Sequence, residues 1–125
     1  IEFLGRVEDE DLPELYSKAI AFINPQEEDF GITAIEAMAS GRPVIAYAAG
    51  GAMETVQAGT TGVFFEDQIW EALADAVIRF KPETYVPGDI AQHAQNFSTE
   101  KFTTSMQEYI DIAYKKFTTN PYGTL

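Results

Sequence analysis

The stretch from Glu28 to Gly41 constrains the fold more than any other, because it reads as a loop leading into a helix between two apolar runs. The first run, Ala19 to Ile23, is followed by Pro25, which cannot extend a β ladder, so the backbone must turn there. Gly31 permits a backbone conformation that a Cβ would block, and Gly41 can end the helix. Between these glycines, apolar residues recur at helical spacing: Ile32, Ile35 and Ala39. The pattern is therefore strand, loop, helix and strand.

Two carboxylates in this stretch indicate its chemistry. Glu28 lies in the loop, whereas Glu36 lies in the helix with its side chain tilted back toward the helix N-terminus, so both can face one ligand there. The free amides near residues 30–32, with the positive end of the helix dipole, suit a phosphate or diphosphate. Carboxylates beside a phosphate make sense only if they accept hydrogen bonds from hydroxyls of the same ligand. A nucleotide sugar has that layout.

The residues around these carboxylates match a wider pattern. Its parts are EDFGITAIEAMASG at 28–41, in which seven residues separate the two glutamates, PVIA at 43–46, Gly50-Gly51 and Glu54. Because these parts occur together and in order, the chain resembles the retaining glycosyltransferases of the GT-B fold, from about Ile1 to Phe117. The amino-acid sequence of the motif at 28–41 most resembles that of mannosyltransferases that build polysaccharide or O-antigen.

This resemblance implies an enzyme that transfers a hexose from a GDP- or UDP-sugar to a glycan or lipid-linked acceptor. It implies that Glu28 is catalytic and contacts the donor sugar, and that Glu36 binds the ribose hydroxyls. The backbone of Phe30, Gly31, Ile32 and Thr33 would bind the sugar and diphosphate. Proximity and electrostatic stabilisation of the departing diphosphate would supply most of the rate. The family's basic residues that neutralise the diphosphate come from the earlier half of the domain, so we expect no transfer by this chain alone.

No cofactor and no metal are expected at this site. Residues 27–29 are all acidic, but adjacent carboxylates on an irregular loop do not converge easily on one cation. Read from spacing alone, Glu28 is a loop carboxylate and Glu36 a solvent-facing helical one; the surrounding motif reverses that interpretation.

The predicted fold is α/β, the later part of a Rossmann-like C-terminal domain with parallel strands and crossover helices. Four strands are expected, at 1–7, 19–23, 43–47 and 62–65. The loop with Gly50-Gly51 and the loop before Gly31 should line one crevice, because both follow carboxyl ends of parallel strands. The domain would span residues 1–117, and residues 118–125 would form a frayed tail or linker.

Several helices are expected outside the central one. The first begins at a capping box of Asp11 and Glu14, and others cover 53–58, 69–80 and 90–96, with a turn at 85–88. Ser98 caps a last helix, whose apolar stripe must pack on something: Phe102, Met106, Tyr109, Ile110, Ala113 and Phe117. Trp70 is interpreted as a packing residue and His93 as an ordinary surface residue.

The charge and composition of the chain limit its possible binding partners. Eight basic and 20 acidic residues give a net charge of −12, which disfavours nucleic acid and anionic membranes. The absence of cysteine removes disulfides and thiolate metal sites. No apolar run approaches the ~18 residues of a membrane span. We expect a cytoplasmic protein, with any contact to the inner membrane face made through regions outside these 125 residues.

Two other functions fit part of this pattern. A noncatalytic module that binds nucleotide sugars or mediates interactions would retain the same motif. A phosphoacceptor signalling domain would suit the length and pattern, but Asn24-Pro25 and Ala46-Tyr47 do not provide its aspartate and lysine.

The resemblance also predicts how strand 1–7 relates to its neighbours. In the family, two strands that these residues do not include separate it from strand 19–23. It must therefore move beside 19–23, or another chain or the rest of the same protein must supply the strands, because central sheet edges would otherwise be exposed. We expect self-association or marginal stability, and the missing N-terminal half as a partner.

Overall fold

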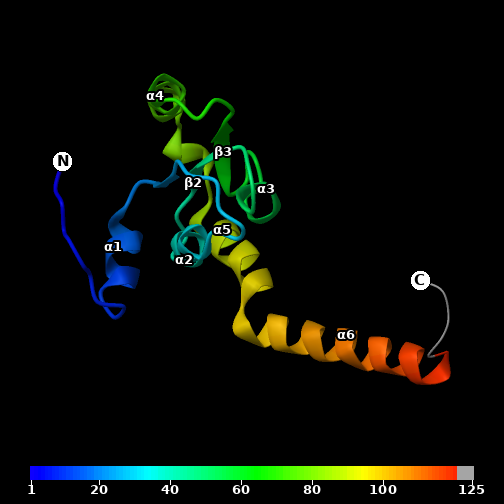
Figure 1. The fold of residues 1–125 in the computed structure, drawn as a ribbon. Helices are drawn as coiled ribbons and strands as arrows, with labels where there is room; N and C mark the ends of the chain where they lie inside the picture. The colour runs from blue at the N-terminus through cyan, green and yellow to red at the C-terminus, as the bar shows by residue number, and fades with distance from the viewer. Residues whose placement is uncertain (121–125) are drawn as a thin grey trace. The chain divides into compact units, whose positions relative to one another are not determined.

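The computed structural model describes residues 1–120, and its centre is a sheet of three parallel strands (Figure 1). These are β1 (Phe22–Asn24), β2 (Val44–Tyr47) and β3 (Gly62–Phe65), in the order β1-β2-β3. Ile45 pairs with Ile23 on one side and with Val63 on the other. The first three residues of β2 are buried, because a central parallel strand is covered on both faces.

The helices of the described residues are α1 (Leu12–Lys18), α2 (Ile32–Ala39), α3 (Ala52–Thr55), α4 (Trp70–Arg79), α5 (Pro87–Ala94) and α6 (Thr99–Thr119), with 3-10 turns at Pro82–Thr84 (η1) and Gln95–Phe97 (η2). The chain divides into two compact units, residues 1–94 and residues 95 onward. The first contains the sheet and α1 to α5.

The core of the first unit forms around α2, which packs against α1, α5 and both β1 and β2. Met38 on α2 and Ile90 on α5 are fully buried. Gly41 ends α2 in a left-handed conformation with φ of 72°. A Cβ at Gly41 would lie 3.1 Å from the Cβ of Pro87, so this glycine also brings the end of α2 close to the start of α5.

The predicted strand at residues 1–7 does not form, and the sheet has three strands rather than four. The segment is the extended blue trace that leads to α1 in Figure 1, and its large apolar side chains Ile1, Phe3 and Leu4 are exposed. An extended segment becomes a strand only through ladder hydrogen bonds. In the part of the chain described, β1 pairs only with β2, so residues 1–7 have no ladder partner.

The capping box predicted at the start of α1 is also absent. Asp11 has helical backbone angles (φ −89°, ψ −20°) and its side chain makes no capping bond. A capping side chain needs an extended backbone to reach back to the helix amides. Asp11 instead lies in a turn in which its amide donates a hydrogen bond of 3.0 Å to the Glu8 carbonyl. Glu14 forms an ion pair with Lys18.

Three other predictions need correction. The turn expected at 85–88 is interrupted because Pro87 opens α5, a first-turn position at which its missing amide costs nothing. The helix expected at 53–58 is shorter and runs over Ala52–Thr55. Trp70 does not pack in the core: it is the first residue of α4 and its exposed fraction is 75%.

In the second unit, Ser98 caps α6 as predicted. Its extended backbone lets Oγ accept a hydrogen bond of 3.3 Å from the Lys101 amide. The helix continues past Phe117 to Thr119, and Thr118 Oγ1 donates to the Tyr114 carbonyl at 3.0 Å. Its apolar stripe is exposed. The rest of the predicted tail, residues 121–125, lies outside the described residues.

Candidate functional site

Loops after all three strands meet at the carboxyl edge of the sheet. The Gly51 amide, after β2, donates to the Glu28 carbonyl, after β1, at 2.7 Å. Gln68, after β3, donates from Nε2 to the Pro25 carbonyl at 3.1 Å. The loops that follow β1 and β2, which were predicted to line one crevice, thus lie against each other at the edge where parallel sheets place their sites.

The double glycine allows this close approach. A Cβ on Gly51 would lie 2.5 Å from the Asp29 carbonyl oxygen and 2.6 Å from the Phe30 Cα, both far inside contact distance. A Cβ on Gly50 would lie 2.3 Å from the Glu28 carbonyl oxygen. No other residue type fits at either position without moving the loop that carries Glu28.

Gly31 starts α2 and turns the chain into the helix. Its backbone is left-handed (φ 78°, ψ 57°), a conformation that only glycine adopts readily, and its carbonyl accepts the first helical bond from Ala34 at 3.1 Å. The amides of Ile32 and Thr33 belong to the first turn, where an α-helix supplies no partner for them. Together with the helix dipole, these amides can bind an anion.

Glu28 is half-buried in the loop just before this helix start. Its carboxylate accepts a hydrogen bond from Nε2 of Gln26. A Cβ built on Gly31 would lie 3.7 Å from Glu28 Oε2, so the carboxylate lies beside the turn into α2. The same Cβ position lies 3.6 Å from Nδ2 of Asn24, a buried residue that ends β1.

Glu36 lies further along α2 and faces a cavity of about 500 Å³ between α1 and α2. The cavity is lined by Asp9, Leu12, Pro13, Tyr16, Glu36, Ala39 and Ser40. The Tyr16 hydroxyl donates a hydrogen bond of 3.2 Å to Glu36 Oε2. Burial raises the pKa of Tyr16, and the charge and hydrogen bond of Glu36 raise it further. Glu28 does not line this cavity, so one ligand must extend along α2 to reach both glutamates.

Sequence reasoning missed two residues near the site. Tyr16 lies on the helix that was predicted from Asp11 and Glu14, and its ring packs edge-on against Phe22 with 5.8 Å between centroids while its hydroxyl is polar. Asn24 directly precedes the Pro25 turn and was not assigned to the site. A polar residue that ends a buried parallel strand is the signal that could have identified it.

His93 is not the ordinary surface residue that was predicted. It is half-buried, with Nε2 2.8 Å from the Thr55 carbonyl oxygen. Because a carbonyl oxygen only accepts, Nε2 carries the proton. The buried Thr55 hydroxyl donates to the Gly51 carbonyl at 3.0 Å. A chain of hydrogen bonds therefore runs from α5 through α3 to the loop that holds Glu28.

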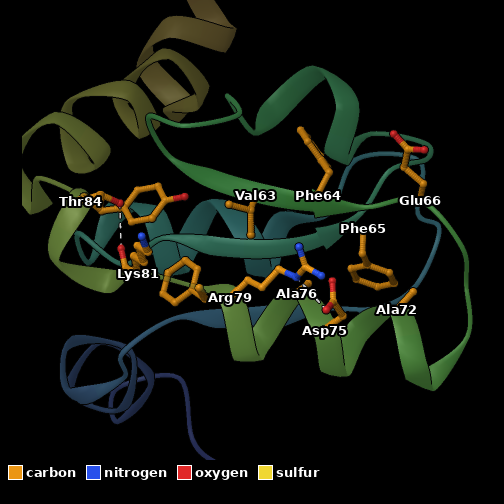
Figure 2. Close-up of a pocket in the computed structure, with 12 residues that line it drawn as sticks. Val63, Phe64, Phe65, Glu66, Ala72, Asp75, Ala76, Arg79, Lys81 and Thr84 are labelled. Atoms are coloured by element: carbon orange, nitrogen blue, oxygen red, sulfur yellow. Dashed lines mark hydrogen bonds and ion pairs between the residues drawn. The ribbon is translucent and has the colours of Figure 1, made fainter.

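A second cavity, of about 450 Å³, lies between β3 and α4 (Figure 2). Figure 2 shows the side chains of Arg79 and Asp75 facing each other across one turn of α4, where Arg79 Nε donates to Asp75 at 2.8 Å. None of the predicted site residues lines this cavity, and its arginine is already paired.

Among residues 1–120, no three His, Cys, Asp or Glu side chains gather in a way that would hold a metal ion. No helix in the same residues is both long and apolar enough to cross a membrane.

Comparison with known proteins matches the sequence of this chain to a family. The family described as "Glycosyl transferases group 1" matches residues 1–97. A D-inositol 3-phosphate glycosyltransferase of Salinispora arenicola is 33% identical over 113 residues, which cover 86% of this chain and 25% of that protein. A mannosylfructose-phosphate synthase of Agrobacterium fabrum is 43% identical over 65 residues, covering 51% of this chain and 14% of that protein. The chain thus spans a quarter or less of these curated relatives.

Solved structures give the same result for the fold. Sucrose-phosphate synthase from Thermosynechococcus elongatus superposes with a TM-score of 0.81 at 33% identity, over 92% of this chain and 30% of that one. The Anabaena protein HepE, solved in complex with UDP and glucose, superposes with a TM-score of 0.60 at 27% identity, over 92% of this chain and 32% of that one.

Proposed function

The chain belongs to the glycosyl transferases group 1, a family of GT-B enzymes, and on that premise we propose that it binds the nucleotide-sugar donor for transfer of a hexose. The observation that carries the proposal is the left-handed turn at Gly31. It begins α2 directly after the loop of Glu28, so the first-turn amides, which have no partner within the helix, follow that loop, while Glu36 lines a cavity further along the same helix.

The donor is proposed to lie along α2. Its diphosphate accepts hydrogen bonds from the amides of Ile32 and Thr33, and its sugar hydroxyls donate to the carboxylate of Glu28. The ribose hydroxyls donate to Glu36 in the cavity between α1 and α2. An extended ligand of this kind accounts for the separation of the two glutamates, and the relative solved with UDP and glucose supports a nucleotide-sugar donor.

The proposed chemistry needs no covalent nucleophile. The first turn of α2 stabilises negative charge that develops on the departing diphosphate, because its amides are already oriented before reaction. Glu28 stabilises positive charge that develops on the sugar ring. No metal is invoked, since amides take the place of a cation at the phosphates.

Donor and acceptor identities are part of the proposal. We infer mannose as the first sugar to test, with GDP or UDP as the nucleotide, because the EDFGITAIEAMASG motif resembles mannosyltransferases and a mannosylfructose-phosphate synthase is among the relatives. The acceptor is a glycan or a lipid-linked acceptor molecule. We propose that the reaction takes place in the cytoplasm and that the rest of the two-domain protein is the partner that completes the site.

Calorimetric titration tests donor binding. The chain is titrated with GDP, UDP, GDP-mannose and UDP-glucose, and Glu36→Ala is expected to weaken nucleoside diphosphate binding by about 1–3 kcal/mol, the value of one charged hydrogen-bond partner. Glu108→Ala, on the exposed surface of α6, is the matched control and should bind as the unmodified chain does. Equal affinity in Glu36→Ala and the unmodified chain would overturn the proposal.

Binding without transfer is the second candidate function. None of the eight basic residues lies in the loops that follow the three strands, so this chain offers the diphosphate no positive side chain there. A transfer assay with radiolabelled GDP-mannose, with and without the rest of the protein, separates the two. Binding with no transfer in the complete protein would favour a noncatalytic module.

A further inference from the structure

We propose that Tyr16 is a positioning residue, which holds the Glu36 carboxylate in the orientation that accepts the donor's ribose hydroxyls. This inference rests on the proposed function and extends it to a residue on a different helix. The contact that carries it is the 3.2 Å hydrogen bond from the Tyr16 hydroxyl to Glu36 Oε2.

The tyrosine ring is itself held in place. It packs edge-on against Phe22 of β1, with an interplanar angle of 78°, so its hydroxyl is directed by contacts on a strand as well as on α1. Figure 1 shows α1 beside α2, and the two helices pack against each other. The hydroxyl therefore approaches Glu36 from a fixed position rather than from a freely rotating side chain.

The hydrogen bond uses only one of the two carboxylate oxygens. A carboxylate has about four acceptor positions. Among the described residues only Tyr16 donates to Glu36, and it does so at Oε2, so Oε1 remains available to a ligand in the cavity that both side chains line. A long glutamate side chain loses rotamer freedom when it binds a ligand, and fixing it beforehand lowers that cost.

A purely structural role for Tyr16 makes a different prediction. If the ring served only to fill space against Phe22, Tyr16→Phe would keep the packing and leave ligand binding unchanged. If the hydroxyl positions Glu36, the same substitution weakens binding even though the protein stays folded. The two roles are thus separable by removing a single oxygen atom.

A double-mutant cycle on the whole chain tests the proposal, with GDP and UDP as the probes in calorimetric titration. Tyr16→Phe is expected to weaken binding about 2- to 10-fold, the net value of one hydrogen bond, and to cause no further loss in a Glu36→Ala background. Tyr85→Phe is the matched control: Tyr85 is also half-buried, but it stacks on Phe80 and does not line the Glu36 cavity. Circular dichroism melting verifies that each variant is folded.

The outcomes are distinct. Unchanged affinity in Tyr16→Phe, or an equal loss with and without Glu36, overturns the positioning role while leaving the proposed function intact if Glu36→Ala still weakens binding. Unchanged affinity in Glu36→Ala overturns the proposed function itself. A loss in Tyr16→Phe that disappears in the Glu36→Ala background supports both.

Discussion

The Gly51 amide donates a 2.7 Å hydrogen bond to the carbonyl oxygen of Glu28, and so ties together the loops that follow two neighbouring strands. The bond uses only backbone atoms, so it holds the loop whatever side chain occupies position 28. The Thr55 hydroxyl in turn donates a hydrogen bond to the carbonyl oxygen of Gly51. The loop that carries the candidate catalytic carboxylate is therefore tied to the start of α3.

Gly51→Ala is expected to destabilise the protein by about 1–3 kcal/mol and to weaken binding of the sugar donor, because the new Cβ would overlap the backbone of Asp29 and Phe30. Urea unfolding followed by circular dichroism measures the first effect and calorimetric titration the second. Gly88→Ala is the control: nothing lies within 4 Å of its Cβ position, and in helix α5 it should stabilise by about 0.5–1 kcal/mol. Equal stability of the two variants would show that the loops do not touch.

Glu28→Ala is expected to leave nucleoside diphosphate binding nearly intact while weakening the complete sugar donor by about 1–3 kcal/mol, because its proposed partner is the sugar. The substitution preserves the backbone carbonyl that Gly51 binds. Titrations with GDP and GDP-mannose, repeated with UDP and UDP-glucose, measure the difference. Glu27→Ala changes the neighbouring exposed carboxylate and should alter neither. Equal losses for both ligands would contradict the assignment of Glu28 to the sugar.

Donor binding is expected to be indifferent to EDTA, because helix amides rather than a cation are proposed to meet the phosphates. The measurement is the affinity for GDP in metal-free buffer, in EDTA, and in buffer with added Mg²⁺ or Mn²⁺. A strict requirement for either ion would be incompatible with the proposed binding mode.

The stability of the fold is expected to fall above pH 10 in a way that depends on Tyr16. Burial, and then the charge and hydrogen bond of Glu36, raise its pKa from 10.0 in the folded protein, so the fold favours the neutral phenol. That contribution is present below the unfolded pKa and is lost as the pH rises through the folded pKa. The unfolding free energy of the unmodified chain should therefore decline more steeply above pH 10 than that of Tyr16→Phe. Parallel slopes in urea unfolding from pH 8 to 11 would contradict this.

Self-association is expected through the exposed apolar segment at residues 1–7. Phe3 and Leu4 have exposed fractions of 93% and 54%, and β1 forms an edge of the described sheet. Light scattering should show species larger than the monomer. Phe3→Ser with Leu4→Ser should reduce them while changing the unfolding free energy by less than about 0.5 kcal/mol, as is usual for exposed positions. An unmodified chain that stays monomeric would refute the expected self-association.

The central helix shows what a local pattern determines. Its apolar spacing and the two glycines predicted a helix between Gly31 and Gly41, and α2 covers Ile32–Ala39 with both glycines left-handed. Strands β2 and β3 and the Ser98 cap were predicted for the same reason. Each depends on residues a few positions apart, whose backbone preferences act before any tertiary contact forms.

Residues 1–7 show where a local pattern fails. Their composition suits a strand, but a strand exists only through hydrogen bonds to a neighbour, and the described sheet supplies none. The prediction that Trp70 packs in the core was wrong for a related reason. An aromatic residue tends to be buried, but whether anything covers it depends on which elements pack there.

The sequence by itself determined the α/β class, the loop-to-helix element and the order of the residues proposed to bind the donor. Only the tertiary structure decided that Tyr16 bonds to Glu36, 20 residues away, and that His93 supports Thr55 across 38 residues. It also decided that Glu36 lines the cavity between α1 and α2 whereas Glu28, in the loop before α2, does not. Such contacts are set by how helices pack on a sheet, and the free energy of that packing comes from the whole core rather than from any short stretch of chain.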